Sequence, residues 1–528
     1  MPTDQIDSCL EESYPQKLAS SPYGMVSTAH PCATDIGCAI LENGGNAIDA
    51  AVAAAFALGV CEPQASGLGG QTMMMIHTRE PRRTFALDGS SRAPNRAAPG
   101  LIPKNERNRG HRATTVPSTP AVLEYARKTY GTFSIAKILE PVIELAKSGY
   151  RITDLQSRLL KREAEHLKSR SAGIFFLKET QDAFNQGELF KQPVLAETFT
   201  QLMEKGIEDF YNGDIAQKIH ADMEANEGLV QLDDLAQIPW PIERRPISVR
   251  YEGKRLITFP PPGAGRTLIE MINLLMSIPE KERNFDTPRG TLVLAEVIRR
   301  AFLDRRDRPF DPSFYPQIED RKMLSEDYTN LVAKQIRKRI KTHGETTHLS
   351  VIDRDGNVVA LTQSIESVYG SCEASPELGF LYNNYMSAFE FSDISHPYYL
   401  RPNAAPWASV APTIVFQGRR PWLAIGSPGS DRITPSILQV LMRLNNQSPL
   451  DAVTAPRIHC TLKGMVHLEA SRMRNDIPDV LRKHGYQIRI REPFSFYLGS
   501  INLVMNDRKE FIGVADQRRD GSAKGPTK

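Results

Sequence analysis

Two threonines and a histidine, Thr346-Thr347-His348, follow a basic, helix-like run and begin a stretch of alternating apolar and polar residues. A threonine hydroxyl is a weak nucleophile until a base removes its proton. A threonine at the start of a chain carries its own base, the α-amine, whose ordinary pKa is about 7.7–8.0. As a chain terminus, Thr346 would therefore supply both the nucleophile and the base needed to attack an amide carbonyl.

Thr346 is internal in the translated chain, so exposing its amine requires a cut after Glu345. The Thr346 hydroxyl could make that cut itself, by attacking the Glu345 carbonyl to form an ester that water then hydrolyses. The preceding charged segment, Leu324 to His343, is predicted to be a surface helix that runs into a flexible link, which would let the cut end move away. The pattern alone does not require this chemistry, because β-branched residues commonly begin strands.

The residues that follow predict a β-hairpin with its turn at Asp355-Gly356. Two registers are possible. A two-residue loop pairs Thr347 with Ser364, whereas a three-residue loop with Gly356 in a left-handed bulge pairs Thr346 with Ser364. Only the second register places both hydroxyls on one face of the sheet, because a one-residue slip moves every side chain to the other face.

The composition is that of an ordinary globular protein, since 41% of the 528 residues are hydrophobic and 24% are charged. A formal net charge of +3 provides no basic excess of the kind that nucleic-acid binding needs. The longest apolar run, Ala47 to Val60, is too short to span a membrane and contains Asp49. The polar N-terminus lacks the regions of a signal peptide. We therefore expect a cytoplasmic protein that binds neither nucleic acid nor membrane.

The six cysteines are scattered and form no CxxC pair, which favours free thiols over disulfides or zinc ligands. His343 and His348 flank the two threonines, but their spacing is not that of a metalloprotease helix, and we expect His348 to be structural. The glycine turns at residues 66–70 and 260–265 lack the Gly-Lys-Ser/Thr of a phosphate-binding loop. The sequence thus predicts no metal site and no cofactor.

Helical and strand patterns divide the chain into blocks that would position these residues. The run from Ala47 to Val60 is predicted as a buried helix capped by Asn46, and a strand follows around Thr72 to His77. Residues 119–190 alternate amphipathic helices with loops, and strand patterns dominate beyond Thr346. Such blocks in one chain predict a layered α/β or α+β architecture. Residues 1–22 are expected to form a disordered tail.

Several blocks in this order resemble the γ-glutamyltranspeptidase family, whose members are self-cleaving N-terminal-nucleophile hydrolases. The blocks, between about Gly24 and Asp516, are GMVSTAHPCATDIGCAILENGGNAIDAAVAAAFALGVCEPQASGLGG, FYNGDIA, PPPGAG, TTHLSVIDRDGNVVALTQSI, YGS, GFLYNN, APTIVFQG and AIGSPGSDRI. The resemblance implies an α+β fold of the four-layer αββα sandwich type. It also implies cleavage at Glu345-Thr346 into a large fragment, 23–345, and a small fragment, 346–528, which form a heterodimer or part of a higher oligomer.

The same resemblance assigns the catalytic roles. Thr346 is the nucleophile for self-cleavage and for turnover, and Ser364 stands where the family normally has a threonine whose hydroxyl supports the nucleophile. This role of Ser364 agrees with the bulged register. The backbone amides of Gly429 and Ser430 match the oxyanion hole, which stabilises the tetrahedral intermediate. The family has Gly-Gly here, so Ser430 would be strained if its position needs a positive φ.

The substrate pocket departs from the family on the side that holds the α-amine of a γ-glutamyl group. The family uses an asparagine, a glutamine or glutamate, and an aspartate. The matching residues here are Glu366, Tyr385 and Ala388. A free α-amino group would therefore lose most of its usual partners.

The pocket also departs on the side that holds the α-carboxylate, where the family uses an arginine and a pair of serines. The arginine position aligns with Ser90, and Arg92 is displaced from it by two residues. The serine pair is replaced by Ala408-Ser409. Losing such buried charge partners costs several kcal/mol, enough to abolish useful affinity for a glutamyl head.

Two classes of function stay open. One is a self-processed amidohydrolase or acyltransferase that cleaves the amide of a small carboxylated acid, γ-glutamyl or another, with water or an amine as acceptor. A specialised biosynthetic enzyme that cleaves an unusual bond is not separable from this class by sequence. The other is a family member that no longer catalyses and serves in binding or assembly. The presence of Thr346, Ser364 and Gly429 argues against that second class.

Overall fold

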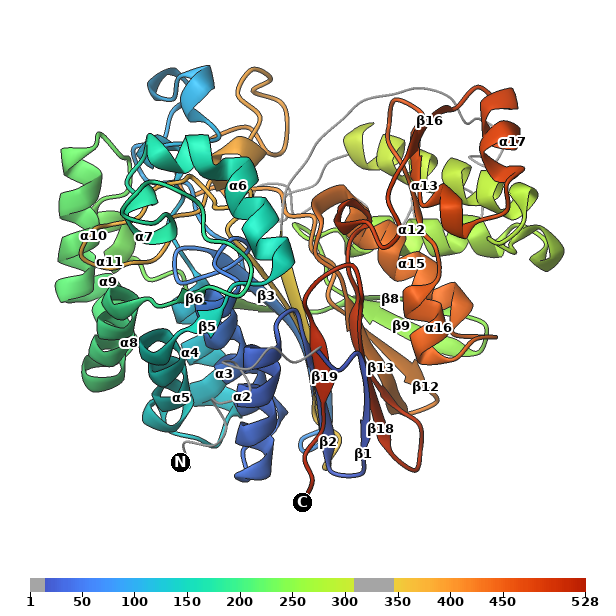
Figure 1. Ribbon diagram of the computed structural model, residues 1–528, viewed down its shortest axis with the longest axis horizontal. Coiled ribbons are helices and arrows are strands. Elements are labelled where there is room, and N and C mark those ends of the chain that lie inside the picture. Colours follow the sequence, from blue (N-terminus) through green and yellow to red (C-terminus); the bar gives the residue numbers. More distant parts are fainter. Residues whose placement is uncertain (1–14, 308–345) are drawn as a thin grey trace.

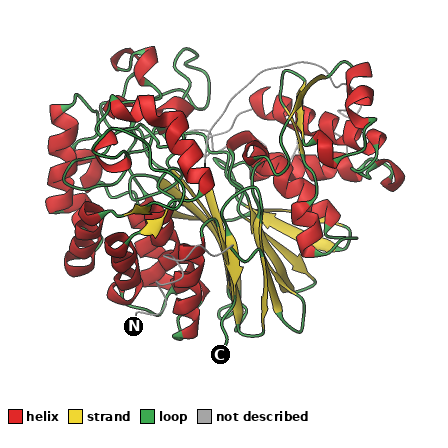
Figure 2. Cartoon of the chain, viewed as in Figure 1, coloured by secondary structure: helices red, strands yellow, loops and turns green. Residues whose placement is uncertain are grey.

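The computed structural model of the protein describes residues 15–307 and 346–528. Its centre consists of two seven-stranded antiparallel sheets, with helices packed outside them (Figures 1 and 2). The first sheet has the order β19 (Ser522–Lys524), β2 (Gly24–Thr28), β10 (Thr347–Asp353), β11 (Val358–Ser364), β3 (Gln71–Thr78), β4 (Arg83–Gly89), β7 (Ile242–Arg244). The second has the order β1 (Leu18–Ser21), β18 (Phe511–Ala515), β17 (Asn502–Asn506), β13 (Arg420–Gly426), β12 (Thr413–Gln417), β9 (Lys254–Thr258), β8 (Ile247–Tyr251).

The helices fall into two groups, one on each side of the sheets (Figure 1). The first group is α2 (Pro31–Glu42), α3 (Ala47–Cys61), α4 (Thr119–Tyr130), α5 (Ile135–Ser148), α6 (Asp154–Lys168), α7 (Gly173–Phe176), α8 (Pro193–Lys205), α9 (Asp209–Asn212), α10 (Asp214–Ala225) and α11 (Leu232–Ala236). The second is α12 (Gly265–Met276), α13 (Pro288–Asp307), α15 (Ile433–Arg443), α16 (Pro449–Thr454) and α17 (Ile477–Lys483). Two small sheets complete the fold, one of β5 (Tyr150–Arg151) and β6 (Leu189–Phe190), the other of β14 (Ile458–Cys460), β15 (Met465–Leu468) and β16 (Gln487–Ile490).

The strands alternate between two apolar environments, as the period of two in a strand requires. In β3, Met74 and Ile76 pack with the first group of helices, whereas Met73 and Met75 belong to a cluster shared with strands of the second sheet. In β13, Ala424 faces that shared cluster, while its neighbours pack with the second group of helices. Both faces of each sheet are therefore covered, and the expected α+β class with antiparallel sheets is confirmed.

Helix α3 is the buried alanine-rich helix that the sequence predicts. Asn46 caps it, since its side-chain oxygen accepts hydrogen bonds from the amides of Ile48 and Asp49. The buried Asp49 carboxylate accepts hydrogen bonds from the amides of Asn46, Thr132 and Phe133, at 3.0–3.1 Å. Asp49 is thus a satisfied structural carboxylate that joins α3 to the α4–α5 connection.

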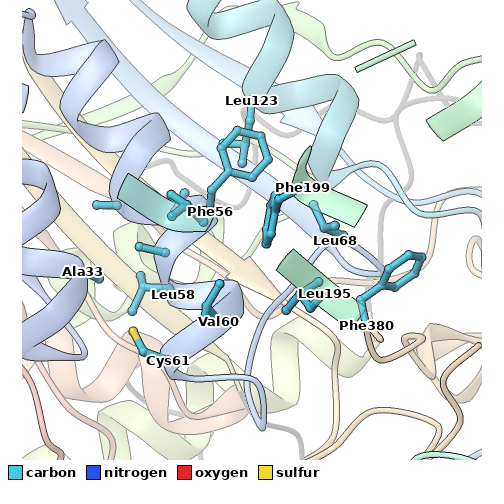
Figure 3. Packing of buried hydrophobic residues seen from close by; sticks show 14 of the residues in the cluster. Ala33, Phe56, Leu58, Val60, Cys61, Leu68, Leu123, Leu195, Phe199 and Phe380 are labelled. Atoms are coloured by element: carbon cyan, nitrogen blue, oxygen red, sulfur yellow. The ribbon is translucent and has the colours of Figure 1, made fainter. Parts of the chain in front are cut away.

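The far end of α3 packs against α8. Phe56 and Phe199 meet edge to face, with their ring centroids 5.9 Å apart, and Figure 3 shows Leu195 and Phe380 beside them. Buried aromatic pairs of this geometry contribute about 0.5–1.5 kcal/mol beyond their buried area. This contact anchors the first group of helices behind the sheet that carries β10 and β11.

Two expectations from the sequence are wrong in part. The disordered tail over 1–22 does not extend to its end, because Leu18–Ser21 form strand β1 and pair with β18. Free thiols are found for Cys38, Cys61, Cys372 and Cys460, but Cys32 is disulfide-bonded. The surface helix and link predicted over 324–343 lie outside the described residues, as does Glu345.

Candidate active site

Thr346 lies immediately before β10 and faces the end of β11. The pairing of Thr347 with Gln363 and of His348 with Thr362 sets the register, so that Thr346 comes opposite Ser364. The loop has three residues and ends at Gly356, whose φ is +91°. The bulged register is therefore confirmed. Thr346 is only 4% exposed in the intact chain.

His348 holds the start of β10 against the second sheet. Its Nδ1 is 2.8 Å from the Thr362 hydroxyl and its Nε2 is 3.1 Å from the Ser350 hydroxyl. A Cβ atom at Gly426, the last residue of β13, would lie 2.2 Å from the imidazole ring. Gly426 thus permits a close approach between the end of β13 and His348, which lies two residues after Thr346. His348 is structural, as the sequence predicts.

Burial lowers the pKa of His348 to about 3, so its folded-state pKa lies below the unfolded value near 6.5. The unfolded chain then binds more protons, and the stabilisation from a neutral His348 is present above pH 6.5 and is lost as the pH falls toward 3. We expect the loss of unfolding free energy between pH 7 and pH 5 to be about 2 kcal/mol larger in the unmodified protein than in His348→Gln.

Denaturant unfolding at the two pH values measures this difference. Burial also raises the pKa of other groups, such as the Glu270 carboxyl, and these groups change the unfolding free energy with pH in the opposite direction. The difference between the unmodified protein and the variant isolates the contribution of His348. His484→Gln is the matched control, because it removes an exposed histidine and leaves His348 in place. An unchanged pH dependence in His348→Gln would contradict the prediction.

The turn after β13 contains Gly429 and Ser430, the residues whose successive backbone amides the resemblance matches to an oxyanion hole. Gly429 has φ +113° and Ser430 has φ +52°. A left-handed conformation is free of strain for glycine, but it costs a residue with a Cβ about 1–3 kcal/mol. The strain anticipated at Ser430 is therefore present. Glu366 is a second such residue, with φ +76°.

Replacing Ser430 with glycine should raise the unfolding free energy by about 0.5–1 kcal/mol, because relief of strain exceeds the added freedom of the unfolded chain. Denaturant unfolding measures the change. Ser430→Ala is the matched control, since it removes the hydroxyl but retains the Cβ, and no gain is expected from it. Equal increases of the unfolding free energy in both variants would show that the Ser430 hydroxyl, and not the backbone conformation, destabilises the protein.

Glu366 and Tyr385 lie close to Ser364, the residue opposite Thr346. The amide of Glu366 donates a hydrogen bond to the Ser364 hydroxyl at 2.8 Å. Tyr385 is 1% exposed, and burial raises the pKa of its phenol. The Glu366 carboxylate raises that pKa further, whereas the side chains of Ser364 and Gln71 lower it. The phenol is therefore a neutral group at physiological pH, held within reach of Ser364.

Gln71 lies beside Ser364, although the sequence predicted no role for it and only a strand around Thr72 to His77. It pairs with Ser364 across β3 and β11, and its Oε1 accepts a hydrogen bond from the amide of Ser91 at 2.8 Å. Its buried Nε2 makes no hydrogen bond of ordinary geometry among the described residues, so its influence on the Tyr385 phenol acts over a longer distance. The signal in the sequence was a polar residue directly after Gly69-Gly70.

Ser90 stands at the arginine position and has a structural partner of its own. Its amide and hydroxyl both donate to Asp88 Oδ1, at 3.1 and 2.6 Å. The other oxygen of Asp88 accepts from Arg244 Nε at 2.6 Å, and this carboxylate is almost fully buried. The Ser90 hydroxyl is thus directed at Asp88.

Within the residues that the structure describes, the other two predicted binding residues, Arg92 and Ser409, make no direct hydrogen bond to Thr346. Arg92 is half-buried and its side chain makes no hydrogen bond or ion pair in the described ranges 15–307 and 346–528. Ser409 is half-buried, and its neighbours are fixed against the proline-glycine turn, with the Ala408 amide donating to Pro262 and the Val410 carbonyl accepting from Ala264. Neither Arg92 nor Ser409 hydrogen-bonds to Thr346 in this part of the chain.

Residues 15–307 and 346–528 contain no cluster of three histidine, cysteine or acidic side chains arranged to hold a metal ion. In the same ranges, no helix has the length and apolar character to cross a bilayer. A cavity of about 930 Å³ lies between the β8–β9 turn, the connection from α12 to α13 and the end of α15, and Thr346 does not line it.

The sequence profile of the gamma-glutamyltranspeptidase family matches residues 33–525. The chain belongs to this family. It is 30% identical over 532 residues to a glutathione hydrolase proenzyme from Escherichia coli (strain K12), an alignment that covers 94% of this chain and 90% of that protein. It is equally similar, at 30% over 538 residues, to the acylase ACY 1 proenzyme from Pseudomonas sp. (strain V22), with 96% and 94% covered.

The fold agrees with membership of the gamma-glutamyltranspeptidase family. The solved structure of a cephalosporin acylase from Bacillus halodurans superimposes with a TM-score of 0.88, at 26% identity and with 98% of both chains covered. Within this family, the chain therefore has relatives named as glutathione hydrolases and relatives named as acylases. Family membership alone therefore does not decide whether the substrate of this chain resembles that of the glutathione hydrolases or that of the acylases.

Proposed function

We propose that the protein is a self-processing amidohydrolase or acyltransferase whose nucleophile is an N-terminal threonine. The observation that carries this proposal is the hairpin register, which sets Thr346 opposite Ser364. The close approach of Gly426 to His348 also holds β13, the strand that leads into the Gly429-Ser430 turn, against the start of β10. A nucleophile, a supporting hydroxyl and paired amide donors are the parts that acyl transfer requires. Membership of a family with proenzyme relatives gives independent support.

Self-cleavage would proceed through the Thr346 hydroxyl. Its oxygen attacks the Glu345 carbonyl, the peptide C–N bond breaks, and the acyl group of Glu345 passes to that oxygen as an ester. The nitrogen of Thr346 takes a proton and becomes the free α-amine. Water then hydrolyses the ester, and this leaves a large fragment that ends at Glu345 and a small fragment, 346–528.

Turnover would use the same atoms. The α-amine of Thr346 accepts the hydroxyl proton as the oxygen attacks the substrate amide, and the amides of Gly429 and Ser430 stabilise the resulting oxyanion. When the C–N bond breaks, the α-amine returns the proton to the departing amine. Water or a second amine then attacks the acyl-enzyme and frees Thr346.

The two fragments would stay associated as a heterodimer, because β10 and β11 are central strands of a sheet whose other strands include β2, β3 and β4. The apolar clusters on both faces of each sheet support a four-layer αββα sandwich of the N-terminal-nucleophile type. Separating the fragments would expose these clusters to water, at about 25 cal/mol for each Å².

A second candidate concerns the substrate, which would be an amide other than γ-glutamyl. It is favoured by the pocket, where Glu366, Tyr385 and Ala388 stand at the amine-binding positions and Ser90 is bonded to Asp88. Small amides such as oxamate, or acylated amines, would be substrates of this kind. The resemblance of the chain to acylases supports it. A homologue that no longer catalyses is the weaker alternative.

Electrophoresis of the purified protein under denaturing conditions, with N-terminal sequencing, tests self-processing. We expect two fragments, the smaller beginning Thr-Thr-His. A single intact chain in freshly folded protein would remove the basis for an N-terminal threonine, and with it the proposed mechanism.

A further inference from the structure

The oxyanion turn contains a strained residue, and strain of this kind persists only where the surroundings enforce it. Ser430 has φ +52° and begins a short 3-10 turn, Ser430–Arg432. The preceding Gly429 accepts its own left-handed conformation without cost. A contact that holds the turn must therefore act on the residues just after Ser430.

Asp431 provides such a contact. Its Oδ1 accepts a hydrogen bond from Arg305 Nη2 at 2.7 Å, and the two side chains are only 11% and 13% exposed. A charge-assisted hydrogen bond that is shielded from water is stronger than a surface ion pair. The carboxylate is one residue away from the strained φ, so the pair can fix the direction in which the chain leaves Ser430.

Arg305 is itself held on two sides. Its guanidinium carbon lies 4.8 Å from the Phe302 ring centroid and 5.0 Å from that of Trp407. Stacking of a guanidinium on aromatic faces is favourable where water is excluded, and it restricts the rotation of the side chain. Trp407 directly precedes Ala408-Ser409, the segment that replaces the serine pair. One arginine therefore contacts both the oxyanion turn and the segment expected to meet the acyl group.

We propose that Arg305 is a positioning residue, which holds the oxyanion turn in its productive conformation through Asp431. The inference rests on the proposed function, and it assigns a role in the same site to a residue of helix α13. Arg305 lies on α13, in the proposed large fragment, whereas Asp431 and Trp407 lie in the small one. The pair thus makes the geometry of the small fragment's oxyanion hole depend on the large fragment.

A set of variants separates this role from general stabilisation. Arg305→Met removes the pair, and Ser430→Gly removes the strain that the pair is proposed to hold. In the Ser430 background, Arg305→Met should lower kcat about tenfold, which corresponds to about 1.4 kcal/mol in the activation free energy, and leave KM within about twofold. In the Ser430→Gly background, the same substitution should lower kcat less than about threefold.

Amide hydrogen exchange of the peptide that spans 427–432 gives a readout independent of turnover. We expect Arg305→Met to speed exchange about tenfold with serine at 430 and to have little effect with glycine there. Asp431→Asn should give the same pattern, and it serves if Arg305→Met does not fold. Arg289→Met is the matched control, because it breaks the exposed Arg289–Glu282 pair on the same helix, away from the turn.

The outcomes are distinct. Equal effects of Arg305→Met in the serine and glycine backgrounds, or no effect on exchange in either, would overturn the positioning role. Failure of the proposed function would appear separately, as an uncut chain without turnover in the unmodified protein. The exchange measurement would still decide whether the pair holds the turn.

Discussion

Replacing Thr346 with alanine is expected to leave one uncut chain and to lower amide hydrolysis by at least about 10⁴-fold, because the substitution removes the attacking oxygen of both reactions. No nearby group replaces it: Ser364 is the closest hydroxyl by register, but it lies on β11 and has no free α-amine to act as its base. Denaturing electrophoresis, N-terminal sequencing and an assay of released amine measure the two effects on one preparation.

Thr347→Ala is the matched control for this experiment. Thr347 is fully buried one residue further along, and its hydroxyl makes no hydrogen bond in the described part of the chain. In a strand, its side chain points to the opposite face from that of Thr346. We expect the control to be cut and active, and Thr346→Ser to be cut more slowly. Cleavage of the Thr346→Ala chain at the same bond would mean that the nucleophile lies elsewhere.

The hairpin shows how far local sequence determines a site. The Asp-Gly turn and the alternation of apolar residues reduced the pairing to two registers, and only a left-handed Gly356 separated them. The structure contains the register that aligns Thr346 with Ser364. The strain at Ser430 was expected from the resemblance, because the family has a glycine at this position and a residue with a Cβ is strained there when φ is positive.

Contacts between residues far apart in the chain were not accessible in this way. The Asp88–Arg244 pair, which fixes Ser90, joins residues that no local pattern connects. The Arg305–Asp431 pair crosses from a helix to a turn in the same manner. Periodicity predicts which face of an element is buried, but it does not predict which polar groups meet there.

Strand β1 was missed for a different reason. Leu18–Ser21 is a short segment at the edge of the second sheet, and its burial alternates between exposed and buried residues. Its hydrogen bonds go to β18, close to the other end of the chain. Four residues carry too little periodicity to be distinguished from a polar tail, so only the distant partner makes them a strand.

The second prediction concerns the substrate, for which we expect glutathione and γ-glutamyl anilides to be poor. Their kcat/KM should be at least about 10²-fold below that of a small amide without an α-amino group, such as oxamate, because loss of buried charge partners costs several kcal/mol. At the carboxylate position, Ser90 is bonded to Asp88 and brings no positive charge. At one position matched to the family's amine-binding residues, Tyr385 replaces a glutamine or glutamate, and its ring is fully buried. Assays of amine or ammonia release, run side by side on the cut enzyme, measure the ratio.

Tyr385→Gln combined with Glu366→Asn tests the physical cause of this preference. Both replacements restore residue types that bind an α-amine, and asparagine tolerates the positive φ of Glu366 better than glutamate does. We expect γ-glutamyl turnover to rise about tenfold, which corresponds to roughly 1.4 kcal/mol of regained binding, while oxamate turnover falls. Gly429→Ala in the oxyanion turn is the contrasting control, because it should lower both activities together. Efficient glutathione turnover by the unmodified enzyme would contradict the prediction. It would mean that a γ-glutamyl group binds well although Ser90 and Tyr385 supply no charged partner for its carboxylate or its amine.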